Sequence, residues 1–171
     1  EDCAKPLEVF SLPDAVDFLC KVTKQQDEEA AENLVEALHC YPLALAIAAA
    51  FIVQNPGTNM AKYLALFECK KITLQQKEMA LVNKGVLDNY KETVKTTLEL
   101  SLNEISDLAI DMLNLMSWLH HENVPSSLLI NWLAKTGHDP DFEFGDIIST
   151  LKQHSLITNQ ADDRYGMHQV L

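Results

Sequence analysis

The residue types that most often carry catalysis are present in this chain, but they are not arranged for it. Carboxylate pairs such as Asp139 and Asp141 have the chemistry for general acid–base work. In a chain this acidic, however, such side chains usually belong to the solvated surface. No Ser-His-Asp or Cys-His order stands near a recognisable nucleophile turn. The sequence therefore does not favour a hydrolase.

The four cysteines predict neither a metal site nor a disulfide framework. Cys3, Cys20, Cys40 and Cys69 are far apart, with no C-x-x-C pair and no histidine at ligand spacing. We expect these thiols to be buried or inert in a reducing compartment, which predicts a cytoplasmic protein. The sequence begins Glu-Asp-Cys, with no Met and no signal-like segment, so we expect an excised piece of a longer chain.

A phosphate-binding loop is also missing from the sequence. Nucleoside triphosphatases cradle phosphates with the backbone amides of G-x-x-x-x-G-K-[ST], and the lysine reaches the terminal phosphates. None of the five glycines here is followed by lysine, and no strand ends in paired acids for magnesium. We therefore expect that this chain is not an enzyme on its own.

Two short motifs remain that have the chemistry to contact a ligand. In His39-Cys40-Tyr41-Pro42-Leu43-Ala44-Leu45, proline opens a very apolar helix. Proline lacks a backbone N–H and has a preset φ, so it fits a helix only in the first turn. The second motif is Tyr165-Gly166-Met167-His168. Taken singly, Pro42 need only start a helix, and His168 need only be a surface histidine at a strand end.

The elements that position these motifs are predicted to be mainly helical. The 171 residues, 47% of them hydrophobic, suit one ordinary domain or two small ones. Five glycines and six prolines are few for a β-rich protein. The longest apolar run, 43–53, is shorter than the roughly 18 residues of a membrane span, so we expect a buried helix there.

Periodicity predicts a four-helix bundle over 11–71 in the first half. Ser11 and Asp27 are expected to cap the first two helices. The third helix runs from Pro42 to about Gln54 and is apolar on nearly every side, as expected at the centre of a bundle. The fourth is expected to end near Lys71. Residues 72–89 are predicted to be a linker or an extra helix, with a domain boundary near 88.

The second half is predicted to be a winged-helix domain over 90–171. Helices are expected at about 91–105, from Ser106 onward, ahead of Gly137, and at about 144–154. The period then changes to two, and residues 156–159 and 164–168 predict a β-hairpin around the turn 160–163. Trp118 and Trp132 are expected in the core. The predicted fold class is all-α: a small helical bundle followed by a winged-helix domain with a C-terminal β-hairpin.

In order and spacing, these segments resemble the NB-ARC branch of the STAND (AP-ATPase) nucleotide switches, tetratricopeptide-linked type. Residues 7–19 resemble the exit from the nucleotide-binding sheet, and Tyr41-Pro42-Leu43-Ala44-Leu45 resembles the Pro-Leu-Ala-Leu helix. Residues 94–101 resemble the start of the winged-helix domain, and Met167-His168-Gln169 resembles the Met-His motif. The chain departs from the family at Cys40-Tyr41, where Gly-Leu is common, and at Gln169, where many members have Asp.

The resemblance implies a regulatory segment of an ATP/ADP signalling switch of the innate-immunity or cell-death type. It implies an exit segment over 1–10 and a helical lid over 11–71. It also implies that Tyr41, Pro42 and Leu43 line the adenine and ribose, and that His168 reaches the β-phosphate of ADP. Imidazole can donate to a phosphate oxygen, and its protonated form is favoured beside that charge.

The same resemblance implies the ligands and partners. ADP or ATP would be held by the full-length parent and not by this segment alone. The implied partners are an upstream nucleotide-binding domain of the same chain, a downstream repeat or sensor domain, and other copies on activation.

Charge bears on the alternative functions. The formal net charge of −12 opposes binding to nucleic acid or to an anionic membrane, and we expect neither partner. Residues 88–171 carry 13 acids against 5 Lys or Arg, which disfavours a winged-helix DNA-binding regulator. The other alternative is a nucleotide-independent interaction scaffold. An intact upstream phosphate loop would favour the switch, and a degraded one would favour the scaffold.

Overall fold

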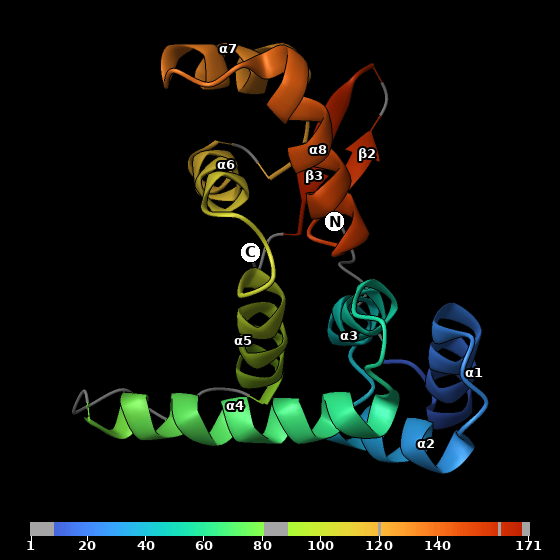
Figure 1. The fold of residues 1–171 in the computed structure, drawn as a ribbon. Helices are drawn as coiled ribbons and strands as arrows, with labels where there is room; N and C mark the ends of the chain where they lie inside the picture. Colours follow the sequence, from blue (N-terminus) through green and yellow to red (C-terminus); the bar gives the residue numbers. More distant parts are fainter. Residues whose placement is uncertain (1–8, 81–88, 120, 161, 169–171) are drawn as a thin grey trace, which may run out of the picture. The chain divides into compact units, whose positions relative to one another are not determined.

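The computed structural model describes residues 9–80, 89–119, 121–160 and 162–168. In these ranges the chain is mostly helical with a small antiparallel sheet, as the composition predicts (Figure 1). The contacts divide the chain into two compact units, residues 1–100 and 101–171, which we call the first and second units.

The first unit contains five helices in its described part: α1 (Leu12–Thr23), α2 (Glu28–Ala37), α3 (Pro42–Gln54), α4 (Met60–Ala80) and most of α5 (Asn89–Leu102). The two predicted caps are present. Ser11 Oγ accepts from the amide of Asp14, and Asp27 Oδ1 accepts from the amide of Ala30. These caps satisfy amides that the first helical turn leaves unpaired.

The core of the first unit forms around α3, which has the predicted bounds and buries 8 of its 13 residues. Alanines on this helix allow the neighbouring helices to pack closely. Leu19 of α1, Leu34 of α2 and Phe67 of α4 are fully buried in the same cluster. Packing therefore holds α3 in place along most of its length.

The helix predicted to end near Lys71 continues, because α4 runs to Ala80 and takes up the first part of the predicted 72–89 linker. Residues 81–88, which contain the predicted domain boundary, lie outside the described residues. The division between the units falls later, inside α5. The reason is that α5 pairs with α4: Lys70 lies 3.3 Å from Glu99, and Gln75 donates to Glu92 over 2.5 Å.

The second unit combines helices with the sheet: α6 (Asp107–Trp118), β1 (Val124–Pro125), α7 (Ser126–Lys135), α8 (Pro140–Gln153), β2 (Ile157–Gln160) and β3 (Arg164–Met167). The predicted hairpin is present, since β2 and β3 pair antiparallel. Strand β1 was not predicted. It pairs with β3 on the other side, giving the order β1-β3-β2. Pro125 is tolerated there because β1 is an edge strand.

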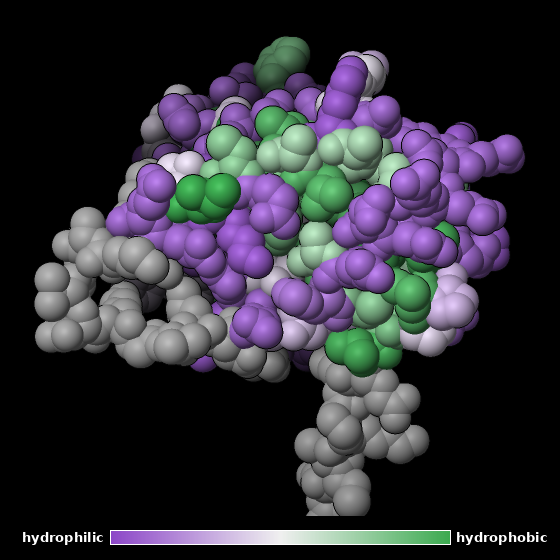
Figure 2. All heavy atoms as spheres, turned by 90° about the horizontal axis from the view of Figure 1, so that it is seen from below, coloured by the Kyte–Doolittle hydropathy of each residue, from purple (hydrophilic) through white to green (hydrophobic). Residues whose placement is uncertain are grey.

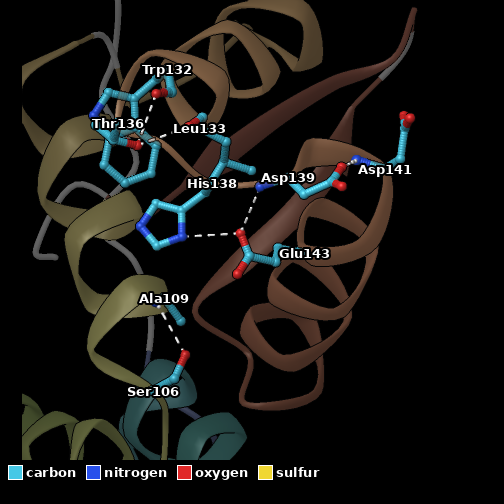
Figure 3. Close-up of polar contacts among 9 residues, drawn as sticks. All are labelled: Ser106, Ala109, Trp132, Leu133, Thr136, His138, Asp139, Asp141 and Glu143. Atoms are coloured by element: carbon cyan, nitrogen blue, oxygen red, sulfur yellow. Dashed lines mark hydrogen bonds and ion pairs between the residues drawn. The ribbon is translucent and has the colours of Figure 1, made fainter.

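Helix α8 begins earlier than predicted, at Pro140. Asp139 is its N-cap and accepts from the amide of Asp141 over 3.1 Å. Glu143 accepts from the amide of Asp139 over 3.1 Å and lies 3.0 Å from Nδ1 of His138 (Figure 3). The proline at the first helical position is the same signal that marks Pro42.

Trp118, which was predicted to lie in the core, is 88% exposed, and Trp132 is half-buried. The buried face of α6 carries Met112 and Met116. Trp118 follows Met116 by two positions, which turns it about 200° around the helix and away from that face. The geometry of the helix therefore places this side chain in solvent.

Apolar side chains also reach the surface elsewhere. Figure 2 shows them among hydrophilic ones on one face of the molecule. Large exposed examples in the described residues are Leu66 and Ile72 on α4 and Phe142 on α8. None of the helices described has both the length and the apolar character that a membrane crossing requires.

Candidate functional site

The four residues predicted to bind nucleotide fall into two groups on different units. Tyr41, Pro42 and Leu43 lie together at the start of α3, in the first unit. His168 follows directly after β3, in the second unit. The local geometry of each group decides what chemistry it can do.

The start of α3 has no side-chain cap among the described residues. Pro42 is the first residue of the helix and Tyr41 is its N-cap, with φ −73° and ψ 118°. No side chain caps this end, and the amide of Leu45 is the one that bonds back to the carbonyl of Tyr41, over 3.0 Å. The amides of Leu43 and Ala44 therefore have no partner within the helix, and the helix dipole favours an anionic acceptor there.

Cys40 has a backbone conformation that suits glycine. Its φ is 55°, and that of His39 is 54°, both in the left-handed region. A side chain in this region costs about 1–2 kcal/mol relative to glycine. Cysteine adopts this conformation here. Burial, and then the charge of Glu36, raise the pKa of the Cys40 thiol, which disfavours the thiolate.

Three aromatic rings lie at the same end of α3. The rings of Tyr41 and Tyr90 meet edge to face with centroids 4.9 Å apart, and His39 lies 5.8 Å from Tyr41. Burial, and then the neighbouring Tyr41, raise the pKa of Tyr90. Such rings offer a flat surface to a planar base. Sequence reasoning missed Tyr90 because α5 brings it to α3 only through tertiary packing.

His168 emerges from a well-anchored strand. Tyr165 and Met167 are buried, whereas His168 is exposed. The amide of Met167 donates to the carbonyl of His121 over 2.7 Å. Partial desolvation, and then the charge of His121, lower the pKa of His168 below 6.5. The resting imidazole is therefore neutral at pH 7, and a nearby phosphate would have to reverse this shift to protonate it.

Hydrogen bonds hold the short segment before β1 next to β2 and β3. The amide of Asn123 donates to Oε1 of Gln160 over 2.6 Å, and Arg164 donates to the carbonyl of Asn123 over 3.0 Å. These bonds cross from β2 and β3 to the segment that carries His121. Sequence reasoning missed His121 because its position depends on the pairing of β1 with β3.

A groove of about 330 Å³ lies between α1 and α2 in the first unit. Leu12 and Val16 give it an apolar wall, and Cys20 lies in it. Its lining also includes three carboxylates, those of Asp17, Glu28 and Glu32. Acidic side chains repel phosphate, so this groove does not suit a nucleotide.

The described residues include no group of three or more His, Cys, Asp or Glu side chains that could hold a metal ion. Neither a scan against models of protein families nor a search of curated proteins gives a match.

Proposed function

We propose that this chain is the lid and winged-helix segment of an ATP/ADP signalling switch of the NB-ARC type, in which His168 helps to hold ADP. The observation that carries the proposal is the setting of His168. Its side chain is exposed immediately after the central strand β3, whose Tyr165 and Met167 are buried. A residue held in this way can reach a ligand while its backbone stays fixed.

The element order of the second unit supports the winged-helix interpretation. Helix α6 precedes β1, helices α7 and α8 follow, and the β2–β3 hairpin closes the unit. The sheet order β1-β3-β2 places the strand that leads to His168 between its two neighbours. The hairpin then corresponds to the wing, and its C-terminal end carries the Met-His motif.

The start of α3 supports the base and ribose contacts proposed for Tyr41, Pro42 and Leu43. Pro42 opens a buried helix whose first amides are uncapped, and Tyr41 with Tyr90 offers aromatic surface beside it. In the proposed switch, a nucleotide contacted by His168 in only one state biases a domain movement through differential affinity. The nucleotide-binding domain, a sensor domain and the other copies of an activated assembly remain proposed partners, and the cytoplasm is the proposed location.

Exposed aromatic side chains favour a second candidate, an interaction scaffold that does not depend on nucleotide. Trp118 is 88% exposed and Phe142 is 78% exposed.

A DNA-binding role has less support than either of these functions. His154, at the C-terminal end of α8, is 6% exposed, and the guanidinium of Arg164 donates to the carbonyl of Asn123.

The test is identification of the nucleotide that copurifies with the full-length protein, by mass spectrometry, followed by ADP release from His168→Ala. We expect bound ADP, released at least about tenfold faster by the variant, since a hydrogen bond to a charged group contributes about 1.5–3 kcal/mol. His138→Ala is the matched control, because His138 is a partly exposed histidine of the same unit that pairs with Glu143. Absence of nucleotide favours the scaffold, and unchanged release from His168→Ala contradicts the assigned role.

A further inference from the structure

The groove between α1 and α2 has an apolar wall along one side of α1 (Figure 1). Leu12, Val16 and Cys20 line it at every fourth position, so the wall extends over two turns and about 12 Å. Leu12 is 40% exposed, and Val16 and Cys20 are half-buried. Burial, and then nearby carboxylates led by Glu28, raise the pKa of the Cys20 thiol, which therefore stays protonated and apolar. Part of this apolar wall remains accessible to solvent.

Three carboxylates border the same groove, and they come from both helices. Asp17 lies on α1, and Glu28 and Glu32 lie one turn apart on α2. All three residues are exposed. Lys21 pairs with Asp17, whereas Glu28 and Glu32 form no ion pair in the described part of the chain. Residues 11–37 as a whole carry seven acids against two lysines, so a cationic partner is attracted to this part of the surface.

The shape of the groove favours a helix over a small molecule as its occupant. Five of the seven residues that line it are exposed, so the groove is open along its length. A small-molecule site usually buries about 70–90% of its ligand, which an open groove does not do. A partner helix with apolar side chains at i, i+4 and i+7 presents them over about 10 Å, which matches the length of the wall. Basic side chains on the flank of such a helix would meet Glu28 and Glu32.

We propose that the α1–α2 groove binds a basic amphipathic helix of a partner protein, with its apolar side chains on the wall and its Lys or Arg side chains beside Glu28 and Glu32. The inference goes beyond the proposed function, because it involves neither nucleotide nor the residues assigned to it. The carboxylates that make the groove unsuitable for phosphate select a cationic partner and reject an acidic one.

The experiment measures peptide binding to the full-length protein by fluorescence anisotropy. The probe is a fluorescein-labelled helical peptide of about 16 residues, with Leu at i, i+4 and i+7 on one face, Lys on both flanks and Ala elsewhere. We expect saturable binding that weakens as salt is added. Peptides with Gln in place of every Leu, or Glu in place of every Lys, should bind at least about tenfold less tightly. Equal binding of the Gln peptide would show attraction to bulk charge alone and overturn the inference, as would no binding of the Leu–Lys peptide.

Charge variants locate the binding on the protein. Glu28→Gln combined with Glu32→Gln should weaken binding of the Leu–Lys peptide by about fivefold, since each exposed ion pair contributes modestly. The matched control is Glu29→Gln combined with Glu36→Gln. It removes the same charge from the same helix, and both residues are exposed and outside the groove lining. An equal loss of affinity in the two double variants would overturn the placement in this groove.

The apolar wall is tested separately. Val16→Thr puts a hydroxyl into the wall with little change in size, and it should weaken binding by at least about threefold because the hydroxyl is desolvated under the peptide. Val22→Thr on the same helix is the control, since Val22 is 40% exposed and lies outside the groove lining. Urea unfolding followed by circular dichroism shows whether each variant is folded. Unchanged affinity in folded Val16→Thr would overturn the docking of apolar side chains on this wall.

Discussion

A Cβ atom on Gly166 would lie 2.4 Å from Nε2 of Gln160 and 3.4 Å from the carbonyl oxygen of His121. The other end of the same amide, Oε1 of Gln160, accepts from the amide of Asn123 over 2.6 Å. Glycine at position 166 therefore leaves room for a side chain of β2 to bind the segment before β1. This arrangement ties the three strands together close to where His168 leaves the sheet.

Gly166→Ala should destabilise the second unit by about 1 kcal/mol, because the new methyl group displaces Gln160 and costs Asn123 its hydrogen bond. In a Gln160→Ala background the same substitution should be neutral or stabilising, since no amide is left to displace and glycine weakens a strand. The measurement is urea unfolding followed by tryptophan fluorescence. Both tryptophans, Trp118 and Trp132, belong to this unit. An equal loss of stability in the two backgrounds would contradict the relationship.

Lys24→Gly should stabilise the first unit by about 1 kcal/mol. Lys24 is the C-cap of α1, with φ 57° and ψ 26°, and it is exposed. Glycine adopts this left-handed conformation without the cost that a side chain carries, and it is the preferred residue at helix C-termini. Circular dichroism at 222 nm during urea unfolding measures the gain. Lys24→Ala is the control, because it removes the same charge and keeps a side chain, and an equal gain from alanine would assign the effect to charge.

Tyr63→Phe should change stability at pH 7 by less than about 1 kcal/mol. Tyr63 is fully buried, its Oη has no hydrogen-bond partner by distance and angle among the described residues, and its ring packs on Phe51 with centroids 5.2 Å apart. Burial raises the pKa of Tyr63 and the facing hydroxyl of Thr97 opposes this shift. The unfolded state therefore ionises first, so stability falls as pH rises above about 10. Urea midpoints at pH 8 and pH 11 should differ less in Tyr63→Phe than in the wild type, and an equal difference would exclude this contribution.

Local signals predicted where most helices begin. Ser11 and Asp27 cap the helices they were expected to cap, and Ser106 caps the helix that was expected to begin there, because a cap depends on residues within one turn. Pro42 opens α3 for the same reason. The sequence Asp139-Pro140 carries an equivalent signal, and it marks the true start of α8.

Features that depend on distant partners were not predictable from local pattern. The extension of α4 is accompanied by side-chain pairs with α5, and the two-residue strand β1 exists only through its pairing with β3. The candidate site divides in the same way. The local settings of Pro42 and His168 follow from neighbouring residues, whereas Tyr90 beside Tyr41 and His121 near His168 follow from tertiary contacts.

The second unit should lose stability as the pH falls from 7 to 5, with His154 as the main cause. His154 is 6% exposed, and its Nδ1 has no hydrogen-bond partner in the described part of the chain. Burial lowers its pKa from 6.5, and the opposing charge of Glu104 does not cancel the shift. The unfolded chain takes up the proton near pH 6.5 and the folded unit only at lower pH, so the stabilisation present above 6.5 is lost on acidification.

The lowered pKa of His168 adds to this pH dependence in the same direction, but less strongly because His168 is exposed. His154→Leu should therefore flatten the dependence of the urea midpoint on pH, with tryptophan fluorescence as the probe of unfolding. His168→Asn should flatten this dependence less. Leucine fills a similar volume and needs no hydrogen bond, so stability at pH 7 should fall little. If His154→Leu keeps the wild-type loss between pH 7 and 5, the buried imidazole does not control that loss.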